Sequence, residues 1–264
     1  MALFNCPNCG KQVSSRAPKC PHCGFDIKNY LAKSYEEEQQ KQQKLLHTAK
    51  IVVPTILGIA ILVWLIYLFA NTSTDIAGHE YVDLNLPSGL KWATCNVGAS
   101  SPEGYGDYFA WGETSPKSSY YKDNCPTYGK DNSWFRSNGY IDYSGNLTPA
   151  HDAARANWGS TWRMPTKAEI DELIENTTTT WTTYNGVYGF LVTSKRNGKS
   201  IFLPAAGYCV GMSLDNEGSL GSYWSSTLNE SQADLAYDLF FDYGDFVWSS
   251  NPRNFDLSIR PVSE

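Results

Sequence analysis

Four cysteines near the N-terminus have the spacing that a metal site needs. The stretch "CPNCGKQVSSRAPKCPHCG" holds two Cys-x-x-Cys pairs separated by ten residues, and its cysteines are Cys6, Cys9, Cys20 and Cys23. Each pair can supply two corners of a tetrahedral metal site, and a glycine after each pair permits a tight turn. A segment this short cannot bury a hydrophobic core, so bound metal would supply its folding free energy. We therefore predict a metal site with these four ligands and zinc as the cofactor.

The repeated Cys-Pro-x-Cys-Gly motif resembles the bacterial zinc-ribbon family, and the resemblance covers residues 1–27. His22 lies inside the second motif and is not expected to be a ligand, because four cysteines already complete the site. Only four basic residues lie nearby, which are Lys11, Arg16, Lys19 and Lys28. Nucleic acid binding needs clustered positive charge. We therefore expect the ribbon to contact a cytosolic protein and expect no nucleic acid partner.

The next segments differ sharply in polarity. Residues 28–50 are polar and helix-prone and are interpreted as a helical linker. Residues 51–70, "IVVPTILGIAILVWLIYLFA", contain no charged side chain. About twenty apolar residues in a helix span a bilayer, so this stretch predicts one transmembrane helix, with a buried core helix as the alternative. Residues 71–79 are interpreted as a short polar linker.

Charge flanking the apolar stretch predicts an orientation. Lysines precede it, whereas the following "NTSTDIAGHE" has no Lys or Arg. The positive-inside bias places the N-terminus in the cytoplasm and the C-terminal part in the periplasm or outside the cell. These features predict a single-pass protein of the bacterial cytoplasmic membrane, with the lipid bilayer as a partner.

Residues 80–264 have the pattern of an α+β domain. Short apolar stretches such as "GFLVTS", "SIFLPAAGY", "SYWSST", "LAYDLFF" and "DFVWSS" predict strands. "PAHDAARANWG" predicts a helix that ends at Gly159. Thr166 and Glu169 form a capping box before a helix with a one-sided apolar face. Residues 114–147 are interpreted as a long polar insertion.

Six ordered blocks carry a second resemblance. "YVDLNLPSGLKWATCNVGA", "YGDYFAWGET", "ANWGSTWRMPT", "FLPAAGY", "YWSST" and "SIRPV" are similar to a paralogous domain of Fibrobacter and Bacteroides surface proteins. That resemblance implies a C-type-lectin-like fold, related to formylglycine-generating enzymes, in a displayed binding domain. The predicted fold is therefore a small zinc ribbon, one transmembrane helix and an α+β lectin-like domain.

The residues that catalysis would need are not arranged for it. The formylglycine-generating enzymes use a pair of reactive cysteines near the C-terminus, but here only Cys95, Cys125 and Cys209 lie in the domain, far apart in sequence. We expect a disulfide between Cys95 and Cys125. His79 and His151 lie in no nucleophile motif. We therefore predict no enzymatic activity, and we expect no calcium-dependent sugar site, because the Glu-Pro-Asn type of motif does not occur.

Binding is the remaining class of function. The segment 227–256 combines rigid aromatic side chains with adaptable polar ones, a composition typical of binding surfaces. Its predicted ligand-binding residues are Tyr243, Asp245, Phe246, Trp248, Asn251, Arg253, Asn254 and Phe255. For Phe246 and Trp248, packing in the core is an equally good interpretation.

The sequence thus predicts a non-catalytic recognition protein that is anchored in the membrane and binds an extracytoplasmic glycan or protein. One alternative is a structural subunit of an envelope assembly. A minor alternative is a variable binding protein diversified by a retroelement.

Overall fold

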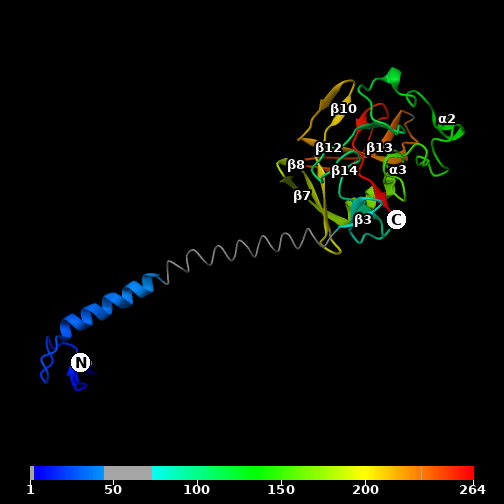
Figure 1. Cartoon of the computed structure of the whole chain (residues 1–264). Helices are drawn as coiled ribbons and strands as arrows, with labels where there is room; N and C mark the ends of the chain where they lie inside the picture. The colour runs from blue at the N-terminus through cyan, green and yellow to red at the C-terminus, as the bar shows by residue number, and fades with distance from the viewer. Residues whose placement is uncertain (1–2, 45–72, 233) are drawn as a thin grey trace. The chain divides into compact units, whose positions relative to one another are not determined.

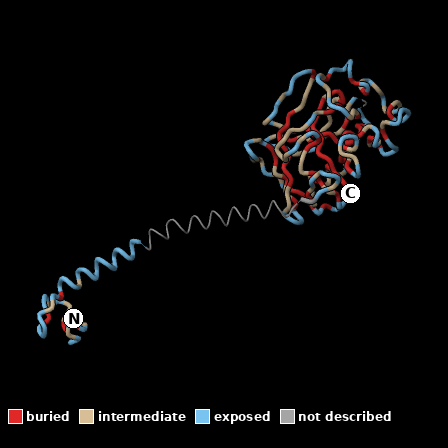
Figure 2. Tube along the Cα trace, viewed as in Figure 1, coloured by how far each residue is buried: buried red, intermediate tan, exposed pale blue. Residues whose placement is uncertain are grey.

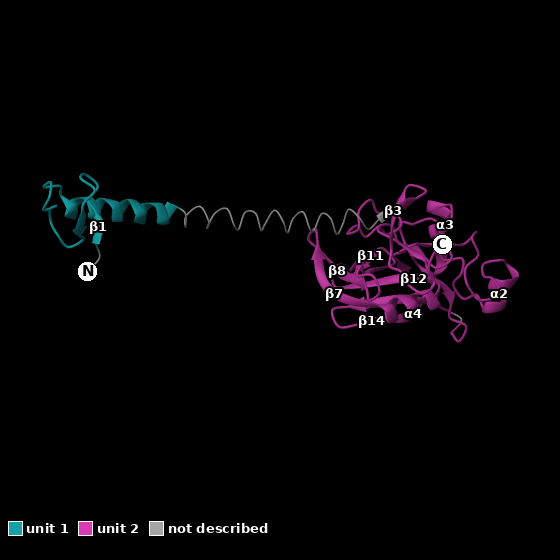
Figure 3. Ribbon diagram, turned by 90° about the horizontal axis from the view of Figure 1, so that it is seen from below, with its two compact units in different colours: residues 1–68 teal, residues 69–264 magenta. Residues whose placement is uncertain are grey.

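The computed structural model describes residues 3–44, 73–232 and 234–264 (Figure 1). It divides into two compact units, Met1–Leu68 and Phe69–Glu264 (Figure 3). Each unit has hydrophobic clusters of its own.

The first unit is a hairpin followed by a helix. Strands β1 (Leu3–Asn5) and β2 (Gln12–Ser14) pair antiparallel. Residues 27–44 are helical, and the Asp26 carboxylate accepts a hydrogen bond from the Asn29 N–H at 2.9 Å, as an N-cap does. The helix is mostly exposed beyond Ile27 (Figure 2). The small core consists of Cys6, Val13, Cys20 and Ile27.

The transmembrane part of the predicted fold requires correction. In the three described ranges, no helix is both long and apolar enough to cross a membrane. The helical residues 27–44 have about the necessary length, but their side chains are mostly polar and exposed. The predicted span, residues 51–70, lies outside the described residues. The predicted single-pass location in a bacterial membrane is therefore not retained.

The second unit is mostly β-sheet. Four small sheets contain its strands, and each pairing between named strands of the described residues is antiparallel. One has the order β16-β5-β4-β3 and joins both ends of the unit: β3 (Ser73–Ile76), β4 (His79–Asp83), β5 (Lys91–Ala93) and β16 (Val262–Ser263). Another has the order β11-β10-β15-β6: β6 (Phe109–Ala110), β10 (Tyr208–Val210), β11 (Ser213–Asp215) and β15 (Asp256–Leu257).

Two three-stranded sheets contain the longer strands. The first has the order β7-β8-β9: β7 (Thr177–Tyr184), β8 (Val187–Ser194) and β9 (Ser200–Pro204). The second has the order β12-β13-β14: β12 (Leu220–Leu228), β13 (Leu235–Asp242) and β14 (Phe246–Pro252). The predicted apolar stretches lie in these strands or at their ends.

Short helices connect the sheets. They are η1 (Lys122–Asn124), α2 (Asn132–Ser137), α3 (Ala153–Trp158) and α4 (Lys167–Asn176). The predicted helix end at Gly159 is confirmed, because this residue caps α3 with a φ of 66° that favours glycine. The predicted capping box of α4 is also confirmed. Two of these four described helices, η1 and α2, lie within the insertion 114–147. The sequence pattern did not predict these two helices.

The core of the second unit has two parts. One places Ile170 and Leu173 of α4 against strands that include Phe190 of β8, Leu239 and Phe241 of β13. The other surrounds Trp111, Trp224 and Phe135, and so buries one side of the insertion. Both parts include residues of β12 and β13, so they hold the β12-β13-β14 sheet, in or beside which the predicted binding residues lie.

Candidate metal centre and aromatic surface

The two cysteine motifs fold into equivalent knuckles. The Cys6 N–H donates to the Lys11 carbonyl at 2.9 Å, and the Cys20 N–H donates to the Phe25 carbonyl at 2.8 Å. In each knuckle the glycine N–H also donates back to the carbonyl of the first cysteine. Gly10 and Gly24 have φ values of 72° and 75°, a region that glycine enters without strain.

The knuckles bring four sulfur atoms together. All four Sγ atoms of Cys6, Cys9, Cys20 and Cys23 lie within 4.8 Å of one another. The sulfurs of Cys6 and Cys23 are 3.7 Å apart, and those of Cys9 and Cys20 are 3.8 Å apart. A regular tetrahedron with Zn–S bonds of about 2.3 Å has sulfurs about 3.8 Å apart. The four thiols therefore fit a tetrahedral zinc ion.

The environment of the thiols differs between the knuckles. A hydrogen bond from the Phe25 backbone, followed by one from the Asn8 side chain, lowers the pKa of Cys23 to about 6. For Cys9 a backbone hydrogen bond from Lys11 favours the thiolate, but burial and the neighbouring thiols outweigh it and raise the pKa to about 12. Four thiolates so close repel one another, and a bound cation removes that repulsion.

The predicted ligand-binding residues of the second unit divide into exposed and buried groups. Tyr243 is 79 % exposed and Trp248 is 48 % exposed, and Asp245 is also exposed. The Asp242 carboxylate accepts from the Asp245 N–H at 3.0 Å and so fixes the turn between β13 and β14. These three remain candidates for ligand contact.

Two of the other predicted residues are buried. Arg253 and Asn254 are buried, at 1 % and 4 % exposed, so their prediction as surface ligand contacts was wrong. The Arg253 guanidinium donates to the Lys130 carbonyl at 2.7 Å and lies 4.3 Å from the Phe135 ring centre. Burial lowers the pKa of Arg253 to about 10. Arg253 thus links the insertion to the segment that follows β14.

Three further predicted residues are half-buried. Phe246 packs on the core, with its ring centre 5.6 Å from that of Phe190, which confirms the alternative interpretation for this residue. The Asn251 amide donates to the Asp238 carboxylate at 3.0 Å. Phe255 stacks on Tyr208 at 5.7 Å between ring centres. These three side chains therefore make contacts within the protein that stabilise the fold.

The structure adds two aromatic residues that the sequence analysis missed. Trp181 of β7 stacks on Tyr188 of β8 at 6.3 Å and meets Tyr243 edge-on at 6.2 Å. Tyr188 is 51 % exposed, and Trp181 is partly exposed. We name Trp181, Tyr188, Tyr243 and Trp248 the hairpin aromatics, because they belong to the β7–β8 and β13–β14 hairpins.

Trp248 is held in place from the helix side. The Lys167 ammonium group lies 4.3 Å from the Trp248 ring centre, and Tyr237 meets the same ring edge-on at 5.5 Å. Lys167 also forms an ion pair with Asp171 at 2.6 Å, so its own position is fixed. The exposed indole is therefore ordered by its neighbours before any ligand arrives.

The Trp162–Thr166 corner is scaffold. The buried Trp162 indole donates to the Ile76 carbonyl at 2.9 Å. Arg163 makes two hydrogen bonds to the Glu169 carboxylate, at 2.8 and 2.7 Å. The side-chain hydrogen bond from Arg163 opposes the effect of burial, and the pKa of Glu169 falls below its ordinary value. The corner thus joins β3, the C-terminal strand and α4.

The three cysteines of the second unit are free thiols, and the expected Cys95–Cys125 disulfide is not formed in the structure. Cys125 is buried in a cluster with Ala110 and Tyr120, against which Cys209 packs. Cys95 instead lines a pocket beside His79. Burial raises the pKa of Cys209 to about 11. The predicted pair is therefore divided between two places in the fold.

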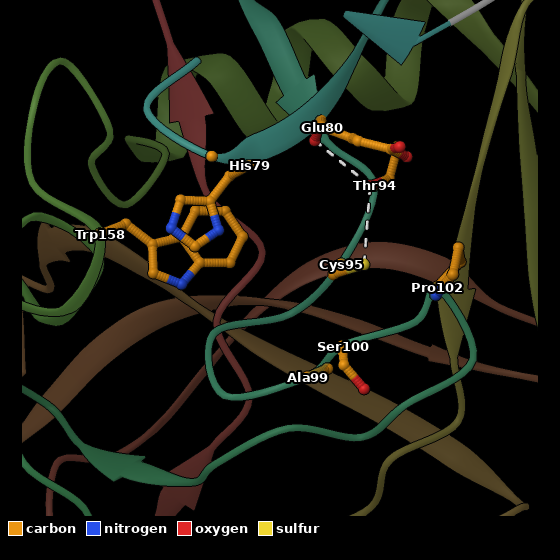
Figure 4. A pocket seen from close by; sticks show the side chains of 9 residues that line it. His79, Glu80, Thr94, Cys95, Ala99, Ser100, Pro102 and Trp158 are labelled. Carbon is orange, nitrogen blue, oxygen red and sulfur yellow. Dashed lines mark hydrogen bonds between the residues drawn. The ribbon is translucent and has the colours of Figure 1, made fainter. Parts of the chain in front are cut away.

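The pocket that contains Cys95 has a volume of about 450 Å³. Its lining residues come from the β3–β4 turn, the start of β4, the loop after β5, and α3: Gly78, His79, Glu80, Thr94, Cys95, Ala99, Ser100, Pro102 and Trp158. His79 stacks on Trp158 with ring centres 3.8 Å apart. Figure 4 shows this ring pair on one side of Cys95 and Pro102 on the other. Burial lowers the pKa of His79, opposed by the charge of Asp75.

One comparison with known proteins bears on the first unit. Residues 2–27 match the family description of a zinc-ribbon domain. An uncharacterized protein of Haemophilus influenzae is 35% identical over 51 residues, which make up 19% of this chain and 64% of that protein. The chain thus covers less than two thirds of this relative. No solved structure matches the chain. Together with the sulfur geometry, the family match identifies the N-terminus as a zinc-ribbon domain whose four cysteines are arranged for metal binding.

Proposed function

We propose that residues 80–264 form a non-catalytic recognition domain that binds a glycan or protein ligand through the hairpin aromatics. The observation that carries this proposal is the exposure of large rings that are already held in place. Tyr243 is 79 % exposed, yet its ring contacts Trp181, which in turn stacks on Tyr188. Large aromatic side chains with little freedom left to lose are the strongest contributors to binding surfaces.

The surrounding charge also supports recognition. Lys167 lies over the Trp248 ring, and the exposed Asp245 lies in the same β13–β14 turn as Tyr243, so the surface offers a cation and an anion as well as apolar area. Such a mixture can orient a ligand by hydrogen bonds while the rings bury its apolar parts. The resemblance of the second unit to lectin-like surface domains agrees with this proposal.

The zinc ribbon has a separate role in this proposal. Its metal would be held by Cys6, Cys9, Cys20 and Cys23 and would stabilise a unit whose hydrophobic core is very small. Its few basic residues favour a protein contact over a nucleic acid contact.

A structural role in an assembly is the second candidate, and one observation favours it. Tyr121, Met212 and Leu214 are 51 %, 79 % and 38 % exposed. Tyr120 and Gly211 exchange two backbone hydrogen bonds, which brings the segment of Tyr121 against the β10–β11 hairpin that holds Met212 and Leu214. A permanent interface would cover this apolar group. Light scattering on the purified chain distinguishes the candidates, because a stable homo-oligomer that Met212→Ser dissolves would indicate an assembly subunit.

The recognition proposal is tested by applying the full-length chain to an array of bacterial and host glycans, and to immobilised protein extracts, with and without EDTA. The companion samples are Trp248→Ala and, as a matched control, Tyr143→Ala, whose ring is fully exposed on the insertion and belongs to neither hairpin. Saturable binding that Trp248→Ala loses and Tyr143→Ala keeps supports the proposal. Binding that survives Trp248→Ala, or no binding by the folded chain, contradicts it.

A further inference from the structure

The pocket beside Cys95 is built from elements other than the two aromatic hairpins, and it is preformed. Asn96, which is fully buried, lies directly after Cys95 and accepts a hydrogen bond from Arg260 at 2.9 Å. Its amide also donates to the Tyr105 carbonyl at 2.9 Å. The Ala99 N–H donates to the Asn96 carbonyl at 3.0 Å. The loop that forms one wall of the pocket is thereby fixed to the core.

The opposite wall is fixed in a similar way. The Trp162 indole donates to the Ile76 carbonyl, just before the turn that leads to His79 at the start of β4. Trp162 also meets the Trp158 ring edge-on at 5.3 Å, so both members of the stacked pair have a buried support. Thr94 donates to the Glu80 carbonyl through its N–H at 3.0 Å and its hydroxyl at 3.2 Å. Ligand binding would therefore cost little free energy for ordering the side chains and loops of this site.

The lining excludes one class of ligand by charge. Neither Lys nor Arg occurs among the nine lining residues, and Glu80 contributes a carboxylate. Burial favours the neutral form of His79, and the nearby Asp75 adds negative charge. An anionic ligand would meet this carboxylate with no cation to offset its desolvation.

The polar groups of the lining require both kinds of hydrogen-bonding partner. The Trp158 indole N–H and the Ser100 hydroxyl can donate, whereas the Glu80 carboxylate can only accept. A neutral imidazole at His79 has one donor and one acceptor nitrogen. Among the described residues, no hydrogen bond occupies these four side chains. An ammonium ligand has donors only and would leave the indole N–H and one imidazole N–H unmatched, whereas hydroxyl groups can both donate and accept.

We propose that this pocket binds a neutral polyhydroxylated ligand, and that a sugar ring is the class that fits. Its volume of about 450 Å³ lies in the range of small-molecule sites. The edges of the stacked His79 and Trp158 rings and Pro102 supply apolar contact for the C–H groups of such a ring. The site does not depend on the hairpin aromatics being a binding surface, because it shares no residue with them.

Saturation-transfer NMR on the full-length chain tests this proposal. The probes are the methyl glycosides of glucose, galactose and mannose, each titrated to about 50 mM so that millimolar dissociation constants are covered. Glucuronate is the anionic comparison. Ser100→Phe places a ring in the pocket from an exposed loop position, and Glu80→Gln removes the charge from an exposed side chain. Tyr143→Ala is the control, because its ring is fully exposed and belongs neither to the pocket lining nor to the hairpin aromatics.

The expected result is saturable transfer to at least one neutral glycoside. Ser100→Phe should weaken that binding at least tenfold and Glu80→Gln about tenfold, since a hydrogen bond to a charged group is lost. Tyr143→Ala should leave it unchanged. Absence of saturable transfer, equal binding by the correctly folded Ser100→Phe chain, or tighter binding of glucuronate would overturn the proposal.

Discussion

Replacing Asp238 by asparagine should stabilise the second unit above neutral pH. Asp238 lies in the middle of the β12-β13-β14 sheet and is fully buried. One carboxylate oxygen accepts from the Ser222 hydroxyl at 2.6 Å and from the Asn251 amide at 3.0 Å, and the other has no partner among the described residues. Burial raises the pKa of Asp238 from 3.8 to about 6, although these two hydrogen bonds oppose the rise.

The sign of the effect follows from proton binding. Because the folded-state pKa lies above the unfolded-state value, the folded protein binds this proton more tightly. The charged form of Asp238 therefore opposes folding, with an effect that begins near pH 4 and is complete above about pH 6. Each pKa unit corresponds to 1.36 kcal/mol, so the penalty is about 3 kcal/mol at pH 8 and about half of that at pH 5.

Urea unfolding of the wild type and Asp238→Asn at pH 8 and pH 5 measures this penalty. Tryptophan fluorescence reports on the second unit, because eight of the nine tryptophans lie in residues 75–264. The variant should gain up to about 3 kcal/mol at pH 8 and only about half of that gain at pH 5. Asp245→Asn, an exposed carboxylate on the same hairpin, should show no such difference. A variant that is less stable than the wild type at pH 8 would refute the reasoning, because it would show that the charged form is stabilised in the fold.

Three further predictions concern other parts of the molecule. Elemental analysis of the full-length chain should find one zinc ion per chain. The Cys20→Ser variant should lose the zinc, whereas His22→Ala should retain it. Equal zinc content in the two variants would contradict the assigned ligands. Thr166→Ala should lower the free energy of unfolding by about 1 kcal/mol through loss of the capping hydrogen bond to the Glu169 N–H, measured by urea titration; no change would show that the cap is dispensable. Phe135→Ala should cost about 3–5 kcal/mol because the side chain is fully buried, whereas a cost below 1 kcal/mol would show that the insertion is not part of the core.

Local signals in the sequence were sufficient for the metal site and for two helix boundaries. The cysteine spacing and the two glycines determine the knuckles within a few residues, so no distant contact is needed. The capping box of Thr166 and Glu169 and the cap at Gly159 are local for the same reason. Strand β7 was missed because its run of threonines is polar, although threonine is β-branched and suits strands.

The binding surface depended on contacts between segments that are distant in sequence. Arg253 was predicted to be exposed because it belongs to the segment 227–256, whose mixture of aromatic and polar residues is typical of a binding surface. In the fold, the Lys130 carbonyl and the Phe135 ring of the insertion contact its guanidinium. Trp181 and Tyr188 were missed because nothing in their own segment indicates that they lie against Tyr243. The side-chain contact between the two hairpins forms only in the folded chain, and a single sequence does not reveal it.

The most direct test of the account is calorimetric titration of the strongest ligand from the array into the wild type and the Tyr243→Ala/Trp248→Ala double variant. Exposed aromatic residues that dominate a binding surface contribute about 2 kcal/mol or more, so the double variant should bind about 30-fold more weakly or worse. Tyr143→Ala should bind as the wild type does. Equal affinity in the double variant, with an unchanged unfolding transition, would show that the hairpin aromatics are not the recognition surface.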